Sequence, residues 1–209
     1  MTLGELKISS LMLVAPSLEI NFDSDSGADI EEKIMELKAN PNVIDYVNGL
    51  VFSINRAFSI IEKRGLTKTK RVKLSFDSLE KTKDGYELSV SKIAPDVLCV
   101  SDVYQAENCR FRQEGDVLIF GNLKKEALEI IYKEKLKRIK ESTSDLYKIP
   151  LDDCILDVIP YFVKGELLLA EDTDEAEISR KHFFDMLSEL GKTEKKHDSD
   201  FVDTVYRIW

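Results

Sequence analysis

The sequence predicts an α+β protein, in which an antiparallel helix bundle carries an antiparallel β region inserted between its second and third long helices. Apolar residues recur every three or four positions before residue 66 and again after residue 146, which is the spacing of buried helix faces. Between these parts they alternate with polar residues, as in strands with one buried face. The predicted division is a bundle core at 1–66 and 146–191, a β insertion at 67–133 and an extended C-terminal tail at 192–209.

Two helices are expected at the start of the chain. Thr2 is followed three residues later by Glu5, a capping-box pattern that predicts a helix beginning directly after Thr2. A loop is expected over 16–29, because Asn, Asp, Ser and Gly cluster there without an apolar period. The second helix is expected to begin near Asp29.

A long helix is the best-defined element of the sequence, and it is expected to begin at Pro41 and end at Gly65. Lys63 and Arg64 precede that glycine, and basic residues followed by glycine are typical of helix ends. The opposite face is polar and is expected to face solvent; its residues are Asp45, Asn48, Asn55 and Glu62. The apolar positions of the helix are Val43, Val47, Leu50, Val51, Ile54, Ala57, Phe58 and Ile61.

Period-two alternation begins at Lys70 and predicts strands in the middle of the chain. Two of these strands are expected to be joined by a turn at Asp84-Gly85. Gly115-Asp116 and Gly121-Asn122 are turn sequences that separate further strands, so the region is expected to be antiparallel. The apolar runs expected to form strands are 72–76, 86–90, 97–100, 109–111, 117–120 and 127–132.

In the last third of the chain the helical period returns, with Asp152 as the expected N-cap. Pro160 removes one helical hydrogen bond, so the helix is expected to bend or to start anew there. Asp174 with Glu177 repeats the capping-box pattern and predicts a last helix. The loop before it is short, which predicts that the last two helices are antiparallel neighbours. The residues after Gly191 are polar until an aromatic ending, and this predicts the extended tail.

Composition limits the classes of function. The chain has 209 residues, of which 43% are hydrophobic, and this is enough to bury a substantial core. Its formal charge of -9 disfavours a protein that mainly grips the nucleic-acid backbone, and it favours protein partners. Neither a signal sequence nor a membrane-spanning segment is expected, so the chain is expected to fold in the cytosol.

Few residues suggest catalysis. Cys99, Cys109 and Cys154 form no Cys-x-x-Cys pair and are expected to be buried as small hydrophobic residues. His182 and His197 lack the neighbours of a nucleophile or metal arrangement. No enzymatic activity and no cofactor are therefore expected.

Phosphate and metal motifs are also missing from the sequence. The nine glycines form no phosphate-binding loop. Two acidic clusters, at 23–29 and 172–175, have alternating oxygen ligands but lack the spacing of a calcium-binding EF-hand loop. They are better explained as loop and helix-cap residues, so no metal is expected.

Two basic runs leave an alternative function open. One extends from Lys68 to Lys73 and the other from Lys133 to Lys140, so a DNA-binding or regulatory protein is a competing hypothesis. Aromatic residues do not interleave with these cations as they do on base-stacking surfaces. A solvated or subunit-facing surface is therefore the preferred interpretation.

Three segments of the sequence resemble a known family, the head-to-tail connector (adaptor, or neck) proteins of tailed bacteriophages. The third segment carries most of the resemblance, and an acidic break and a final helix follow it as in the closing helix pair of such adaptors. The segments are Met1-Thr2-Leu3-Gly4-Glu5-Leu6-Lys7, the stretch from Tyr46-Val47-Asn48 to Ile54-Asn55-Arg56-Ala57, and Val158-Ile159-Pro160-Tyr161-Phe162-Val163-Lys164-Gly165-Glu166-Leu167.

The resemblance implies a structural subunit of the virion neck, assembled in the cytoplasm of the bacterial host. Such subunits form a homo-oligomeric ring, usually of twelve copies, that docks on the portal protein and contacts tail-side proteins. DNA would pass through the lumen during packaging and ejection without sequence-specific binding. Helices would form the ring body, and no membrane would be involved.

Candidate contact residues follow from this reading. The aromatic C-terminus either folds on its own core or reaches a neighbour, and the polar linker before it favours the neighbour. Basic residues are candidates for meeting an acidic face on the next subunit, and Phe52 widens the apolar face of the long helix. The portal-docking candidates are Phe201, Val205, Tyr206, Ile208 and Trp209, and the subunit-interface candidates are Arg64, Lys70, Arg71 and Phe52.

Overall fold

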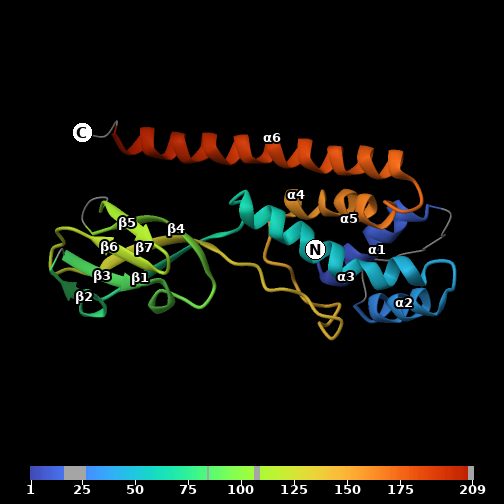
Figure 1. Ribbon diagram of the computed structural model, residues 1–209, viewed down its shortest axis with the longest axis horizontal. Coiled ribbons are helices and arrows are strands. Elements are labelled where there is room, and N and C mark those ends of the chain that lie inside the picture. The colour runs from blue at the N-terminus through green and yellow to red at the C-terminus, as the bar shows by residue number, and fades with distance from the viewer. Residues whose placement is uncertain (17–26, 84, 106–108, 207–209) are drawn as a thin grey trace. The chain divides into compact units, whose positions relative to one another are not determined.

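The computed structural model describes residues 1–16, 27–83, 85–105 and 109–206 (Figure 1). The protein is a mixed α+β chain with two antiparallel sheets. It divides into two compact units. The helical unit contains residues 1–66 and 138–209, and the β unit contains residues 67–137.

Helix α1 (Leu3–Val14) begins where the sequence predicts it. Thr2 accepts a hydrogen bond from the Glu5 backbone N–H, and the Glu5 carboxylate accepts one from the Thr2 N–H. The predicted capping box is therefore confirmed. Helix α2 (Gly27–Ala39) begins two residues before the expected start at Asp29.

Helix α3 (Ile44–Lys63) begins three residues later than the predicted start at Pro41. The carbonyl of Asn40 accepts hydrogen bonds from the N–H groups of Val43 and Ile44, and this turn occupies the predicted first residues of the helix. The predicted end is confirmed. Gly65 has φ +70, and the N–H groups of Gly65 and Leu66 bond to the carbonyls of Glu62 and Ile61, which is a Schellman closure.

The remaining helices are α4 (Asp153–Leu156), α5 (Ile159–Leu167) and α6 (Thr173–Tyr206). Pro160 lies in the first turn of α5, where its missing N–H costs no helical bond, so a new helix starts there instead of a kink. The predicted cap of the last helix is wrong. Asp172, two residues before Asp174, accepts the hydrogen bond from the Glu175 N–H and caps α6.

Helix α5 lies at the centre of the helical unit, in contact with α1, α3 and α6. It runs antiparallel to α6, as predicted, because Phe162 contacts Phe183 whereas the later Lys164 pairs with the earlier Glu175. The rings of Phe162 and Phe183 are 4.9 Å apart between centroids and are both fully buried. Leu3, Leu6, Leu50 and Ile54 are also fully buried in the unit.

The predicted extended tail is wrong for the residues that the structure describes. The backbone of α6 is helical through Tyr206, so 192–206 continue the helix. Between Lys192 and Tyr206 no proline or glycine interrupts the helix, and lysine and glutamate favour it. Gly191 is therefore tolerated inside the helix and does not end it. Its cost of about 1 kcal/mol relative to alanine is outweighed by the helix-favouring residues around it.

The described residues of the β unit form seven strands in two sheets around one core. One sheet has the order β1-β7-β4 and the other the order β2-β3-β6-β5, and all pairs are antiparallel. Short 3-10 turns lie at Phe76–Ser78 and Val90–Lys92. The strands are β1 (Thr69–Leu74), β2 (Glu80–Thr82), β3 (Gly85–Ser89), β4 (Val97–Tyr104), β5 (Phe111–Glu114), β6 (Val117–Phe120) and β7 (Leu128–Glu134).

Of two predicted turns in the β unit, one is confirmed and the other lies partly outside the described residues. Gly115 has φ +58 and, with Asp116, joins the paired residues Glu114 and Val117, so the predicted turn is confirmed. In the other turn, Gly85 already begins β3, and Asp84 lies outside the described residues.

The expectation that the cysteines are buried is wrong for two of the three. Cys99 is exposed on β4, because its neighbour Val100 takes the inward position of the alternating strand. Cys154 is exposed on α4, whose buried side chains are Ile155 and Leu156. Cys109 is partly buried against the core of the β unit.

No helix in the described part of the chain is long and apolar enough to cross a membrane.

Candidate functional site

Phe52 is, with Met35, one of the two most exposed large apolar side chains in the described part of the helical unit. It lies on the solvent side of α3, opposite the buried face that includes Leu50 and Ile54, and 66% of it is exposed. An exposed aromatic ring on the polar side of an amphipathic helix leaves apolar surface in water that a partner could cover. The structure thus places this predicted interface residue where a partner could reach it.

The ring of Phe52 is held by a chain of charged side chains. The guanidinium of Arg56 lies 5.8 Å from the ring centroid, in cation–π contact, and it pairs with Glu166 of α5. Glu166 is only 5% exposed, and its other oxygen lies 2.8 Å from Nη2 of Arg180 on α6. That second contact is a charge contact without hydrogen-bond geometry. Three helices are thereby joined at one carboxylate beside the exposed ring.

A glycine makes this arrangement possible. A Cβ atom at Gly165 would lie 2.4 Å from Cγ of Arg180 and 2.8 Å from the carbonyl oxygen of Ala176. Both distances are shorter than a carbon contact allows, so any other residue would push α6 away from α5. The sequence resemblance included Gly165 and Glu166, but periodicity alone did not reveal that they work together.

Helix α3 also holds the segment at 138–139, which follows the β unit in the chain. The side-chain amide of Asn55 donates to the carbonyl of Ile139 at 2.9 Å and accepts from its N–H at 3.0 Å. Arg138 donates to the buried Glu62 at 2.5 Å. These contacts use the face of α3 that the sequence suggested was simply solvated, which is a correction for Asn55 and Glu62.

Arg64, another predicted interface residue, is engaged within the helical unit. Its guanidinium lies 5.4 Å from the ring centroid of Phe184, and it donates to the hydroxyl of Ser188 at 3.0 Å. Both partners lie on α6. Arg64 therefore connects the end of α3 to α6, although its residue remains exposed.

Lys70 and Arg71 lie on β1, in the β unit, and both have acidic partners. Lys70 Nζ lies 2.6 Å from Asp96 and 2.9 Å from Glu134. The hydrogen bond to Asp96, followed by that to Glu134, raises the pKa of Lys70 above its usual range, and the bond from Lys70 lowers the pKa of Asp96. Arg71 lies 3.7 Å from Glu129.

The predicted portal-docking residues come from the end of the chain. Phe201, Val205 and Tyr206 lie in the last turns of α6, where the structure describes the backbone only. Ile208 and Trp209 lie outside the described residues. In a continuous helix, position 201 falls on the same face as position 183, because 18 residues make five turns.

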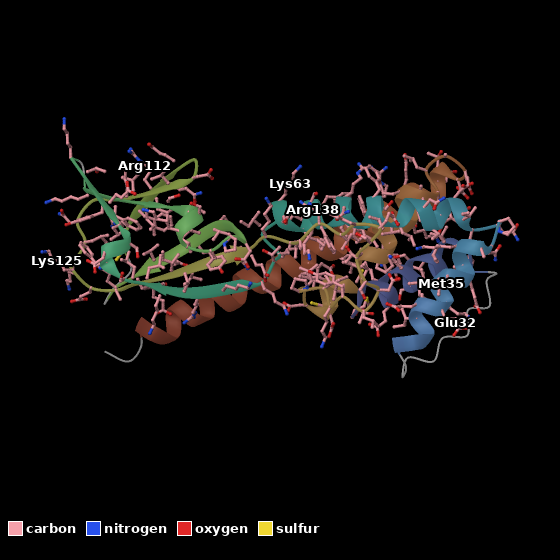
Figure 2. The ribbon with its side chains drawn as sticks, turned by 90° about the horizontal axis from the view of Figure 1, so that it is seen from below. Glu32, Met35, Lys63, Arg112, Lys125 and Arg138 are labelled. Carbon is pink, nitrogen blue, oxygen red and sulfur yellow. The ribbon has the colours of Figure 1, made fainter. Side chains whose placement is uncertain are left out.

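Sequence reasoning missed the other exposed apolar side chains. Ile178 is 64% exposed on α6, out of phase with the buried Phe183 and Leu187 of the same helix, and this phase difference was the available signal. The large apolar side chains that are exposed in the described residues are Met12, Met35, Ile44, Phe52, Leu146, Leu169 and Ile178. Figure 2 shows Met35 and Glu32 together on α2.

The described residues contain no group of three or more histidine, cysteine or acidic side chains that could hold a metal ion. His182 contacts Tyr161 edge-on at 4.4 Å between ring centroids, which is a packing contact. The candidate contact site in the described residues is the exposed ring of Phe52 with the ion pairs of Arg56, Glu166 and Arg180 beside it.

No family model matches the chain, and no curated protein is significantly similar to it.

Proposed function

We propose that this protein is a structural subunit of a bacteriophage head-to-tail connector, a ring that docks on the portal and joins the DNA-filled capsid to the tail. In this proposal an antiparallel helix bundle forms the ring body, an antiparallel β region is inserted between its second and third long helices, and the end of the chain docks on the portal. The observation that supports it most is Phe52, an exposed ring fixed by Arg56 and Glu166. Aromatic and arginine side chains that are held in place before binding make strong protein contacts.

The distribution of charge agrees with a channel that DNA passes without binding. The helical unit has 16 basic and 27 acidic side chains. Such an excess of acidic groups repels phosphates, so DNA would slide along it instead of adhering. In this proposal the ring is homo-oligomeric, with twelve copies as the expected number, and it is located in the virion neck.

The DNA-binding alternative is less well supported by the ion pairs. Phosphate contacts need cations that are available to the backbone of the nucleic acid. In the first basic run, Lys70 pairs with Asp96 and Glu134 and Arg71 with Glu129. In the second, Arg138 pairs with Glu62. The β unit carries 14 basic and 12 acidic side chains, which is close to neutral.

Binding to the purified portal ring encoded in the same genome tests the proposal. The full chain should co-sediment with the portal, and a chain lacking residues 201–209 should not, while its far-UV circular dichroism shows that it is folded. A full-length variant with Phe201→Ser and Val205→Ser is the matched control for chain length, and it should also lose binding. A full chain that ignores the portal but shifts duplex DNA at physiological salt would replace this proposal with the alternative.

The composition of the virion gives an independent check. Antibody labelling in electron micrographs should place the protein between capsid and tail, and the neighbouring genes should encode portal, capsid and tail proteins. A protein absent from purified virions would overturn the connector function.

A further inference from the structure

The solvent side of α3 carries a single stripe of exposed side chains. Residues 45 and 63 are separated by 18 positions, which is five helical turns, and Phe52 and Arg56 lie between them within the same narrow sector. Asp45, Phe52, Arg56 and Lys63 are all exposed. The side chain of Lys63 points away from the ribbon (Figure 2). Along the helix the stripe therefore reads acid, aromatic, cation, cation.

This order is complementary to itself when reversed. If a second α3 lies antiparallel to the first, with residues whose numbers add to 108 facing each other, Asp45 faces Lys63 of the other copy. Phe52 then faces Arg56 of the other copy. Between these pairs Gly49 faces Ser59 of the other copy, and both residues are neutral. One register thus satisfies both charges and both members of the cation–π pair at the same time.

Within one chain Asp45 and Lys63 cannot pair with each other, whereas Phe52 and Arg56 already form a cation–π contact. Asp45 and Lys63 are about 27 Å apart along the helix axis, at 1.5 Å per residue, so they can pair only between copies. Arg56 covers one face of the Phe52 ring, and the ring remains 66% exposed. The Arg56 of a second copy would meet that remaining surface.

An acid at the start and a base at the end of a helix also suit the dipole of the helix itself. That explanation accounts for Asp45 and Lys63, but not for Phe52 in the middle of a polar face. Along the helix axis the midpoint of the stripe is position 54, with Phe52 and Arg56 two residues to either side of it and the opposite charges of Asp45 and Lys63 nine residues to either side. This symmetry is the arrangement of a two-fold contact.

We propose that the free chain forms a two-fold dimer in which the α3 helices of two copies pack antiparallel, with Asp45 against Lys63 and Phe52 against Arg56 of the partner copy. This goes beyond the connector function and does not depend on it. The dimer covers Phe52 in the free subunit. One helix pair is a small interface, so the dimer is weak and exchanges readily.

Charge reversal tests the register. Asp45→Lys places lysines opposite each other at both ends of the dimer, and Lys63→Glu places acids there. Each single variant should dissociate at least tenfold more readily than the wild type in analytical ultracentrifugation. The double variant D45K/K63E restores both pairs within each dimer and should associate like the wild type.

Mixing the two single variants is the sharper experiment. One copy then has lysine at both positions and the other has acids at both, so an equimolar mixture should form a heterodimer although neither variant dimerises alone. Native mass spectrometry with one variant isotope-labelled identifies it. Asp45→Asn and Lys63→Gln, which oppose the helix dipole less, keep the test valid should a reversed variant unfold by circular dichroism.

Phe52→Ala tests the centre of the contact and should also weaken dimerisation at least tenfold. Three results would each overturn the proposal: a wild type that stays monomeric at millimolar concentration, a mixture without heterodimer, or an F52A variant that associates normally. Portal binding by the full chain is measured separately. Failure of the dimer with intact portal binding removes this inference alone, whereas the reverse result removes the connector function alone.

Discussion

The helical unit and the β unit are built on the same principle of one buried core but use their charged residues differently. In the helical unit, Glu166 and Glu62 are buried and connect one helix to another element through arginines. In the β unit, Lys70 and Arg71 pair with acids on neighbouring strands or loops, and these pairs stay partly exposed. A buried carboxylate must keep its cationic partners, and this fixes the geometry around it, whereas pairs in which both side chains are exposed contribute little to stability.

This contrast indicates that the positions of the helices around Glu166 must be fixed more accurately than those of the strands. The three helices that meet at Glu166 lie beside the exposed Phe52, so their positions decide how the ring is presented. The strands of the β unit are already held by continuous backbone pairing and by an apolar core of their own. Substitutions should therefore affect the two units in different ways.

The largest expected effect is loss of a core ring in one unit only. Phe162→Ala should destabilise the helical unit by about 3–5 kcal/mol, because it empties a fully buried site, and Phe120→Ala should do the same to the β unit. Hydrogen exchange with mass spectrometry in increasing urea would report each unit through its own peptides. If either variant lowered the unfolding midpoint of both units equally, the two units would not have separately stabilised cores.

Phe52→Ala is the matched control for these substitutions. Its ring is mostly exposed, so the free energy of unfolding of the monomer should change by less than about 0.5 kcal/mol. A loss comparable to that of Phe162→Ala would mean that Phe52 supports the fold rather than a partner contact.

A smaller effect is expected at Gly165. An alanine there brings its Cβ against Arg180 and the carbonyl of Ala176, and overpacking of this kind costs about 1–3 kcal/mol. Urea unfolding of the helical unit should show the loss. Gly121→Ala in the β unit is the control, since its added Cβ would meet nothing within 4 Å and should leave stability almost unchanged. Equal effects at both glycines would contradict the role assigned to Gly165.

The sequence predicted the structure correctly where it depends on residues close together in the chain. The capping box of Thr2 and Glu5 and the closure of α3 at Gly65 each depend on residues a few positions apart, and both are confirmed. The short apolar run at 117–120 coincides with β6, whereas the run at 109–111 shares only Phe111 with β5.

The predictions were wrong or incomplete where the structure depends on residues far apart in the chain, or where two local patterns favour different structures. The turn at Asn40 displaced the start of α3, and Gly191 alone did not outweigh the helix-favouring residues after it. Of the candidate contact residues, the spacing identified Phe52 but could not show that Arg56, Glu166 and Arg180 fix it, since 110 residues separate Arg56 from Glu166. Ion pairs between helices leave no periodic trace in a sequence.

The smallest expected effect concerns pH and the ion pair of the β unit. The pKa of Asp96 is lowered by the hydrogen bond from Lys70, so the folded state binds its proton less tightly than the unfolded state does. The stabilisation is therefore present above the ordinary aspartate pKa and is lost as the pH falls below it. The pKa of Lys70 is raised, so its contribution is lost only at strongly alkaline pH.

The magnitude should be about 1 kcal/mol or less, because the side chains of Lys70 and Asp96 are 42% and 30% exposed and water screens their attraction. Asp96→Asn should lower the urea midpoint of the β unit slightly at neutral pH and reduce its decrease in acid, without affecting the helical unit. Asp77→Asn, at an exposed carboxylate of the same unit, is the control. An acid-induced decrease that is the same in wild type and D96N would show that this pair does not contribute to the pH dependence. The exposed pairs of the β unit would then be as neutral for stability as surface ion pairs usually are, and the contrast with the buried Glu166 would become sharper.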